Sequence, residues 1–453
     1  MQKRALLFIV IVLYLIFFII PWEMNIKIQA IAALMIIQIL WVGKVFPLAY
    51  SSLLVILLFS FHFFTYEETL TYLGSDVVWL LFSTFILSNA LIDTGLANRM
   101  SLSILKLSRG ASRTLLPISF ASVFVISILV PSNVGKASLI SSVLDSLIKS
   151  LGAIQNAKNL AKSLFIGITY LVPIAGAFIA TGASSTIYAY SLFAQHGTTI
   201  HFLNWIYIFG VPIIIFAIFL WILFLFMYPP EAINREYLLT LIEEEIHKLG
   251  KMSRNEKKML WIIGFTLLLW MTQDIHGYSI PLIGLLGACL TMLPGIGVWE
   301  WNQAKKSVNW DIILFFASTL MVSGMLIDTG TINWLSKYLN VLIDSQSPFV
   351  IVLILVLITS LLRIMFVNVL GFLAIMLPLA FTLGDTLSGV SALLLAKAVF
   401  LAGIPGFFFI TQSPVHLISY SYGYFTEREL FRVGVIASLV WVGIICLAFW
   451  VFW

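Results

Sequence analysis

One stretch of this sequence occurs twice, and the two copies lie 235 positions apart. Residues 91–95 read Leu-Ile-Asp-Thr-Gly, and residues 326–330 read the same five letters. The match continues upstream, where residues 76–84 correspond to residues 311–319. Five identical residues at one fixed offset indicate an internal duplication. We therefore expect a chain whose two halves are built alike.

The composition limits what these halves can be. Of the 453 residues, 61% are hydrophobic and 10% are charged, whereas soluble domains carry about 25% charged residues. Apolar runs approach the roughly 20 residues that cross a bilayer, so the sequence predicts an all-α polytopic membrane protein. The net charge of +5 comes mainly from Lys and Arg between the spans, which argues against a nucleic-acid partner. Cys289 and Cys446 lie in apolar segments and suggest neither a disulfide nor a thiolate metal site.

The duplication also contains two short breaks inside apolar stretches. The first, residues 130–136, reads Val-Pro-Ser-Asn-Val-Gly-Lys; the second, residues 366–370, reads Phe-Val-Asn-Val-Leu, with Asn133 aligned to Asn368. A helix that stops in hydrocarbon leaves backbone amides unpaired, so such a break survives only inside protein or beside a water-filled cavity. Each break predicts the tip of a re-entrant hairpin and a candidate binding site.

Basic residues set the expected orientation. Lys3 and Arg4 place the N-terminus in the cytoplasm, and a basic loop after Leu96 lies on the same side. The span that begins at Asp76 then runs opposite to its duplicate at Asp311, so the repeats are inverted. We expect about eleven transmembrane helices plus two re-entrant hairpins, with the C-terminus outside the inner (plasma) membrane. The expected segments are N-terminal scaffold helices (1–70), a first repeat (71–228) with a cytoplasmic-side hairpin at about 114–149, a cytoplasmic linker (229–259), and a second repeat (260–453) with an outer-side hairpin at about 349–382.

Charged residues inside apolar stretches are candidates for function. A charge there costs about 3 kcal/mol on insertion scales, and Lys136, Arg363 and Lys397 all occupy such places. A guanidinium can bind a carboxylate through two hydrogen bonds, while a structural ion pair or snorkelling is the alternative. An asparagine amide can donate to an anion or accept from a cation; it can equally cap a helix. His416 can titrate near neutral pH, which would permit proton coupling; an ordinary hydrogen bond is the favoured alternative.

The breaks resemble those of the divalent anion/sodium symporters, over about Asp76 to Gly423. In that family each hairpin tip carries Ser-Asn-Thr, and each half has a later unwound segment near Gly-Thr-Pro-Pro-Asn. Here the tips read Ser-Asn-Val at 132–134 and Val-Asn-Val at 367–369, and the unwound segments are 182–186 and 412–416. The resemblance implies a homodimeric carrier that moves small anions by an elevator-like motion.

Two departures from that family pattern bear on the coupling ion. Both motif threonines are valines here, Val134 and Val369. Five residues before Asn368, where the family usually has a small hydroxyl residue near a sodium ion, this chain has Arg363. Sodium needs oxygen ligands and a guanidinium repels it. The resemblance implies sodium coupling, whereas these residues suggest the hypothesis of a sodium-independent exchanger, a proton-coupled carrier or a uniporter.

Taken together, the residues and the resemblance define two candidate sets. The expected substrate-binding residues are Ser132, Asn133, Val134, Lys136, Ser184, Ser185, Arg363, Asn368, Val369, Ser413 and Pro414. A weaker cation-binding set comprises Asn133, Gly182, Asn368 and Gln412.

The function expected is secondary active transport of a di- or tricarboxylate, coupled to Na⁺ or H⁺ or to neither. No enzyme activity, cofactor or resident metal is expected, since no catalytic or metal-binding motif is found. An inorganic oxyanion such as sulfate or phosphate is an alternative cargo. A non-carrier anion channel or receptor is an alternative function.

Overall fold

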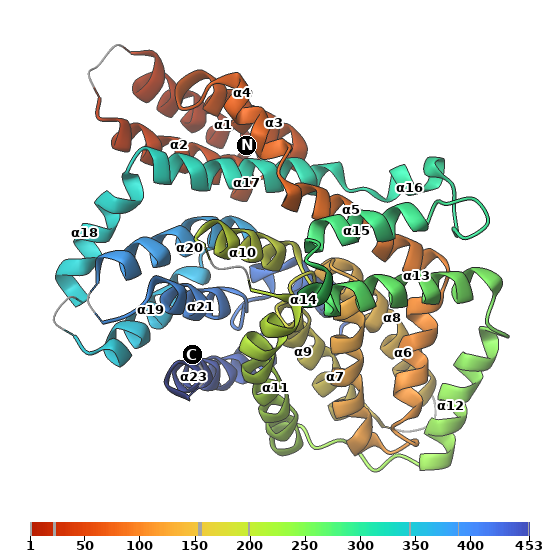
Figure 1. Ribbon diagram of the computed structural model, residues 1–453. Helices are drawn as coiled ribbons and strands as arrows, with labels where there is room; N and C mark the ends of the chain where they lie inside the picture. The colour runs from red at the N-terminus through yellow and green to blue at the C-terminus, as the bar shows by residue number, and fades with distance from the viewer. Residues whose placement is uncertain are drawn as a thin grey trace.

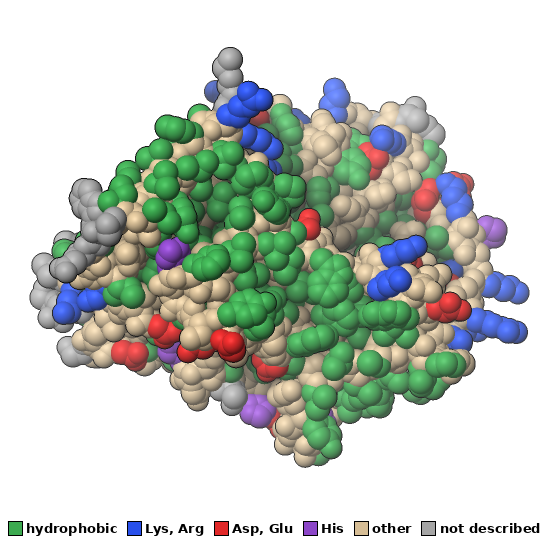
Figure 2. All heavy atoms as spheres, turned by 90° about the horizontal axis from the view of Figure 1, so that it is seen from above, with side chains coloured by type: hydrophobic (Ala, Val, Ile, Leu, Met, Phe, Trp, Pro, Cys, Tyr) green, Lys and Arg blue, Asp and Glu red, His purple; other side chains and the backbone are tan. Residues whose placement is uncertain are grey.

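Helices make up the regular structure of this computed structural model (Figure 1). It describes residues 2–20, 24–152, 156–197, 200–343, 346–387, 389–451 and 453, and no strand occurs among them. Six helices in these ranges are long and apolar enough to cross a membrane, and five shorter ones are apolar. In Figure 2, hydrophobic side chains cover much of the visible face, with Lys and Arg gathered toward its top and right. The chain is an all-α, multi-pass membrane protein, as predicted; the number of crossings stays a prediction.

The two halves present the same series of helices. The first half contains α5 (Asp76–Asp93), α6 (Leu96–Lys106), α7 (Ser112–Leu129), α8 (Asn133–Gly152), α9 (Lys158–Ala175), α10 (Ser184–Gln195) and α11 (Phe202–Met227). The second contains α17 (Trp310–Asp328), α18 (Thr331–Ile343), α19 (Pro348–Arg363), α20 (Val369–Thr386), α21 (Ala392–Gly403), α22 (Pro414–Ser421) and α23 (Glu427–Val451). Both breaks fall between helices, at α7–α8 and at α19–α20. The inverted orientation of the halves stays a prediction.

The remaining helices precede each of these series. The N-terminal set is α1 (Gln2–Tyr14), a π-helical turn (Leu15–Ile19), α2 (Ile26–Val42), α3 (Leu48–His62) and α4 (Tyr66–Leu73). The central set is α12 (Arg235–Lys248), α13 (Arg254–Met271), α14 (Gln273–His276), α15 (Ile280–Leu290) and α16 (Trp301–Ser307). Each set packs against the half that it does not precede. From the N-terminal set, α3 and α4 contact α17 of the second half, and from the central set, α15 and α16 contact α5 of the first half. Each half is therefore completed by helices of the other.

The repeated pentapeptide ends in glycine for a geometric reason. Gly95 and Gly330 have φ values of 83° and 66°, in the left-handed region that glycine enters without strain. Each glycine turns the chain from one helix directly into the next, from α5 into α6 and from α17 into α18.

The basic loop expected after Leu96 is wrong in part, because residues 96–106 form helix α6. Its buried face comprises Leu96, Ala97, Ser101, Leu102 and Leu105, while Lys106 points outward and pairs with Glu243. The stretch is amphipathic, and it forms a helix because one face packs against α7 and α12. The basic side chains alone favour a loop, whereas the spacing of the apolar residues favours a helix.

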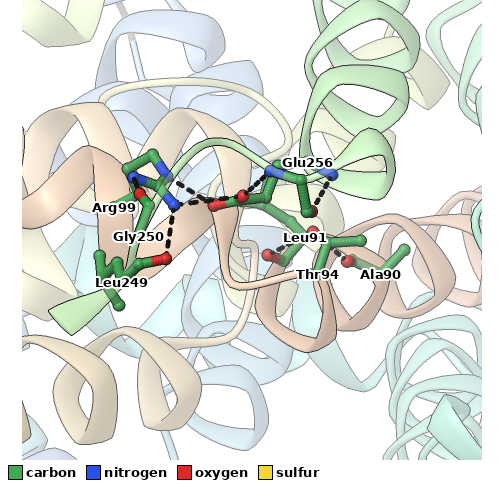
Figure 3. A network of polar contacts seen from close by, with 8 residues as sticks. Ala90, Leu91, Thr94, Arg99, Leu249, Gly250 and Glu256 are labelled. Carbon is green, nitrogen blue, oxygen red and sulfur yellow. Dashed lines mark hydrogen bonds and ion pairs between the residues drawn. The ribbon is translucent and has the colours of Figure 1, made fainter. Parts of the chain in front are cut away.

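The central linker is fastened to the first half. The Ser112 hydroxyl donates to the Glu231 carbonyl at 2.6 Å. The Glu231 carboxylate accepts from the backbone amides of Asn159 and Leu160, at 2.7 and 3.1 Å, at the start of α9. Farther along, Arg99 donates to the carbonyls of Leu249 and Gly250 and to both oxygens of Glu256 (Figure 3). The linker is thus held by hydrogen bonds near the N-terminal ends of α6, α7 and α9.

Candidate anion-binding cavity

A cavity of about 920 Å³ lies where the two breaks meet. Residues 131–134 and 366–371 contribute the tips. Ser184 and Ser185 line the cavity from the first turn of α10, and the residues around the start of α22 that line it are Thr411, Ser413, Pro414, Val415 and Leu417. The N-terminal helices and the flanks of α5 and α17 complete its wall. Four segments far apart in sequence therefore share one cavity.

The cavity brings together most of the predicted site residues. Those that line it are Ser132, Asn133, Val134, Ser184, Ser185, Asn368, Val369, Ser413 and Pro414. Four predicted residues lie behind the lining instead, namely Lys136, Gly182, Arg363 and Gln412. Their direct contact with a substrate or a cation stays a prediction.

Four helices begin at this cavity: α8 at Asn133, α10 at Ser184, α20 at Val369 and α22 at Pro414. A helix N-terminus exposes unpaired amides and carries roughly half a positive charge. No Asp or Glu side chain lines the cavity among the described residues, whereas Lys3 and Lys44 do. The electrostatic character of the cavity therefore suits an anion.

The break in the first half is wider than expected from the sequence. Helix α9 ends at Ala175, and Ser184 to Thr186 already form the first turn of α10. The unwound segment is therefore 176–183. The Thr186 hydroxyl donates to the Gly176 carbonyl at 2.8 Å and closes the segment. Its backbone groups must find partners outside a helix.

Lys136 supplies one such partner. It lies on α8, one turn after Asn133, and is fully buried. Its Nζ donates to the carbonyl of Gly182 in the unwound segment, at 2.9 Å. No ion pair of the described residues includes Lys136, so its charge is held by backbone oxygen rather than by a carboxylate.

Arg363 plays the equivalent part in the second half. It ends α19 and is 1% exposed. Its guanidinium donates to the carbonyls of Gly403 at 2.9 Å and Gln412 at 3.3 Å, and to that of Phe366 in its own hairpin tip. Each half thus has one buried cation that joins its hairpin to the carbonyls of its own unwound segment.

The two repeat-related asparagines are used differently. The Asn368 side-chain oxygen caps α20 by accepting from the amides of Leu370 and Gly371, at 2.9 and 3.4 Å. The Asn133 oxygen is buried and has no hydrogen-bond partner among the described residues. Asn368 therefore acts as a helix cap. Asn133 retains an unsatisfied acceptor beside Gly176.

Two further polar residues singled out in the sequence lie away from the cavity lining. His416 is fully buried, and its Nδ1 lies 2.9 Å from the Phe409 carbonyl, so it stabilises the second unwound segment. The Lys397 ammonium lies 5.9 Å from the centre of the Trp453 ring, a cation–π contact. Both have structural partners within the fold.

The N-terminal contribution to the cavity was not predicted from the sequence. Lys3, Gln38, Trp41, Lys44 and Ser51 all line it, yet none lies in the duplicated region. One sequence signal was available: Gly43-Lys44 places a glycine and a cation at the end of an apolar run. Nothing in the sequence indicated that this turn faces the tips.

The sequence of this chain is similar to those of several known proteins. A family model described as "Sodium:sulfate symporter transmembrane region" matches residues 1–453. The citrate/succinate antiporter of Escherichia coli K12 is 23% identical over 390 residues, covering 83% of this chain and 78% of the relative. Chloroplastic dicarboxylate transporter 2.2 of Arabidopsis thaliana is 25% identical over 383 residues, covering 81% and 68%. The sodium-dependent dicarboxylate transporter SdcS of Staphylococcus aureus USA300 is 26% identical over 364 residues, covering 74% and 68%. This chain belongs to the sodium:sulfate symporter family of membrane carriers.

Proposed function

We propose that the protein is a secondary active transporter of small anions and that the shared cavity is its cargo site. One observation carries this proposal: four helix N-termini converge on a cavity whose described lining contains lysines and no carboxylate. Fixed positive potential at a helix-broken site is how carriers hold an anionic group away from bulk water. These charges and helix ends disfavour a cationic cargo.

The proposed motion is that of an elevator, in which the hairpin-bearing helices move as one body. Several contacts tie the two halves of that body together. The Tyr170 hydroxyl donates to the carbonyls of Phe407 and Leu430, at 3.1 and 2.6 Å. Lys162 on α9 pairs with Glu429 on α23 at 2.6 Å. Such cross-links favour rigid-body movement over independent motion of each hairpin.

The proposed transport does not require sodium. In both halves, carbonyl oxygens of the unwound segment, which could otherwise coordinate a cation, accept from Lys136 or Arg363. A fixed ammonium or guanidinium would repel a sodium ion placed beside it. Lys136 and Arg363 are fixed parts of the protein. When no cargo is bound, the hairpin-bearing helices would therefore carry two positive charges across the membrane without an anion to balance them. Exchange of one bound anion for another avoids that cost.

The proposed cargo is a di- or tricarboxylate. The relatives named above are described as carriers of citrate, succinate or dicarboxylates. An inorganic oxyanion such as sulfate is the second candidate, favoured by the family description. An anion channel would use the same cavity but would not saturate at low turnover.

The assembly and topology proposed are a homodimer in the plasma membrane with the N-terminus in the cytoplasm. The topology rests on the basic residues Lys3, Arg4 and Arg99, and the dimer on family resemblance. Mass measurement in detergent and reporter fusions at either terminus test the two points separately.

The transport proposal is tested by uptake of labelled succinate into liposomes that contain the purified protein. We expect saturable uptake above protein-free vesicles when the lumen is preloaded with succinate. Asn368→Ala should lower the rate at least about tenfold, because it removes the cap at one tip. Asn302→Ala, an exposed change on α16, is the matched control and should leave the rate unchanged. Absence of saturable flux with succinate, citrate and sulfate alike would refute a carrier of these anions.

A further inference from the structure

The wall formed by the N-terminal helices differs from the hairpin tips in what it presents to the cavity. Lys3 comes from α1, Gln38 and Trp41 from α2, Lys44 from the turn after α2, and Ser51 from α3. All five lie outside the hairpins, on helices that the proposed motion leaves in place. We call these five residues the scaffold wall.

Lys44 has an unusual backbone conformation. Its φ is 47°, and only one other non-glycine residue of the described chain, Arg109, has a positive φ. Glycine is the residue that takes this conformation without steric cost. The chain instead places a lysine there, with its exposed side chain on the cavity.

The charges of the scaffold wall form no ion pair with any residue that the structure describes. Lys3 and Lys44 are the charged residues among the described lining, and neither takes part in an ion pair of the described residues. Lysines without a nearby carboxylate raise the local concentration of anions at the wall. This effect is reduced by salt when the charges are solvent-exposed.

Three other residues of the scaffold wall carry hydrogen-bond donors that find no partner in the described part of the chain. They are Gln38 Nε2, Trp41 Nε1 and the Ser51 hydroxyl, all buried. An amide NH₂ and an indole NH can only donate, and a buried donor without a partner is costly. An oxyanion is the kind of group that satisfies donors of this type.

We propose that the scaffold wall is a second anion subsite, which binds one carboxylate of the cargo while another group faces the hairpin tips. Lys44 provides the main attraction, Lys3 adds to it, and Gln38 supplies a hydrogen-bond donor. This subsite rests on the proposed function, since it serves the same cargo. It favours an anion with two carboxylates over a monocarboxylate of similar size.

The test uses Lys44→Gly, which removes the cation and relaxes the backbone. The variant should fold at least as well as the parent, with an equal or higher Tm. Succinate binding to the purified full-length protein is measured by calorimetry at about 20 and about 200 mM salt. We expect binding to weaken about threefold to tenfold at low salt, with a shallower salt dependence. Lys44→Arg should retain the parent affinity.

Arg109→Gly is the matched control, because it makes the same change at the other positive-φ residue, which is not on the cavity. Its succinate affinity should equal that of the parent. A second readout compares succinate with butyrate: the preference for succinate should shrink in Lys44→Gly. If Lys44→Gly binds succinate as the parent does at both salt concentrations, the subsite is wrong and the carrier proposal stands. If the parent itself binds neither succinate, citrate nor sulfate, the carrier proposal fails first.

Discussion

Lys136 and Arg363 show how single residues can stabilise a break between two helices. Each is buried, and each donates to carbonyls that no helix partner can satisfy. A buried ammonium or guanidinium is costly unless its hydrogen bonds are made. The cation and the unwound carbonyls therefore stabilise each other, and burying either one alone would be costly.

Arg363→Ser tests whether that cation replaces a coupling ion. The change leaves the Gly403 and Gln412 carbonyls without their donor, so we expect a lower Tm, by an amount equivalent to about 2–4 kcal/mol. If sodium can then occupy the vacated place, sodium but not potassium should restore Tm and transport. Arg428→Ser, at an exposed arginine of α23, is the control. Unchanged transport with unchanged response to sodium would contradict this role of Arg363.

Among the helices, α23 is held closely against the second unwound segment. A Cβ at Gly434 would lie 1.8 Å from the Phe407 carbonyl oxygen and 3.0 Å from the Tyr170 hydroxyl. That carbonyl also accepts the Tyr170 hydrogen bond. Glycine is required here by close approach of backbone to backbone.

Gly434→Ala should therefore disturb the body that carries the tips. We expect a loss of about 1–3 kcal/mol of stability from overpacking, together with reduced transport, because Phe407 must move. Gly443 lies on the same helix, and a Cβ added there would meet no atom within 4 Å. Gly443→Ala should raise stability by up to about 1 kcal/mol. The measurement is the Tm of each variant by thermal unfolding, which should be lower for Gly434→Ala than for Gly443→Ala. Equal Tm values would contradict the packing argument.

The linker is attached to α6 by a charge-assisted contact. Arg99 donates to both carboxylate oxygens of Glu256, at 2.6 and 3.3 Å, and Glu256 also accepts from the Ser253 amide at 2.6 Å. The hydrogen bond from Arg99 is the main cause that lowers the pKa of Glu256 below its usual value. The ionised form is therefore the one that the folded state favours.

The pH dependence of this contact has a definite sign. Because the folded pKa of Glu256 lies below the unfolded value of about 4.3, its stabilisation is complete at neutral pH. It is lost as the pH falls through the folded pKa. Glu256→Gln keeps an N3 acceptor for the helix cap and should lower stability at pH 7 by about 1–3 kcal/mol. The Tm difference from the parent should narrow below about pH 4; a constant difference would show that the charge is not responsible.

For the whole molecule, the duplicated parts were the most predictable from sequence. The fixed offset located both tips, and the Asn133 and Asn368 positions both line the cavity. The partners of Lys136 and Arg363 could not be predicted, because a backbone carbonyl 40 or more residues away leaves no mark on the sequence. Helix α6 was missed because charged residues on one face concealed an apolar face. Lys44 was missed because its role depends on which turn faces the tips.

Above all, we propose that fixed protein cations replace a coupling ion in an anion carrier. The decisive experiment is uptake of labelled succinate, measured with sodium or potassium outside and with vesicles empty or preloaded with succinate. Without bound cargo, two buried cations with no balancing anion oppose the return of the hairpin-bearing helices. Uptake should therefore occur only into preloaded vesicles, and it should be equal in the two salts. Sodium-dependent uptake into empty vesicles would refute the proposal and identify an ordinary sodium symporter.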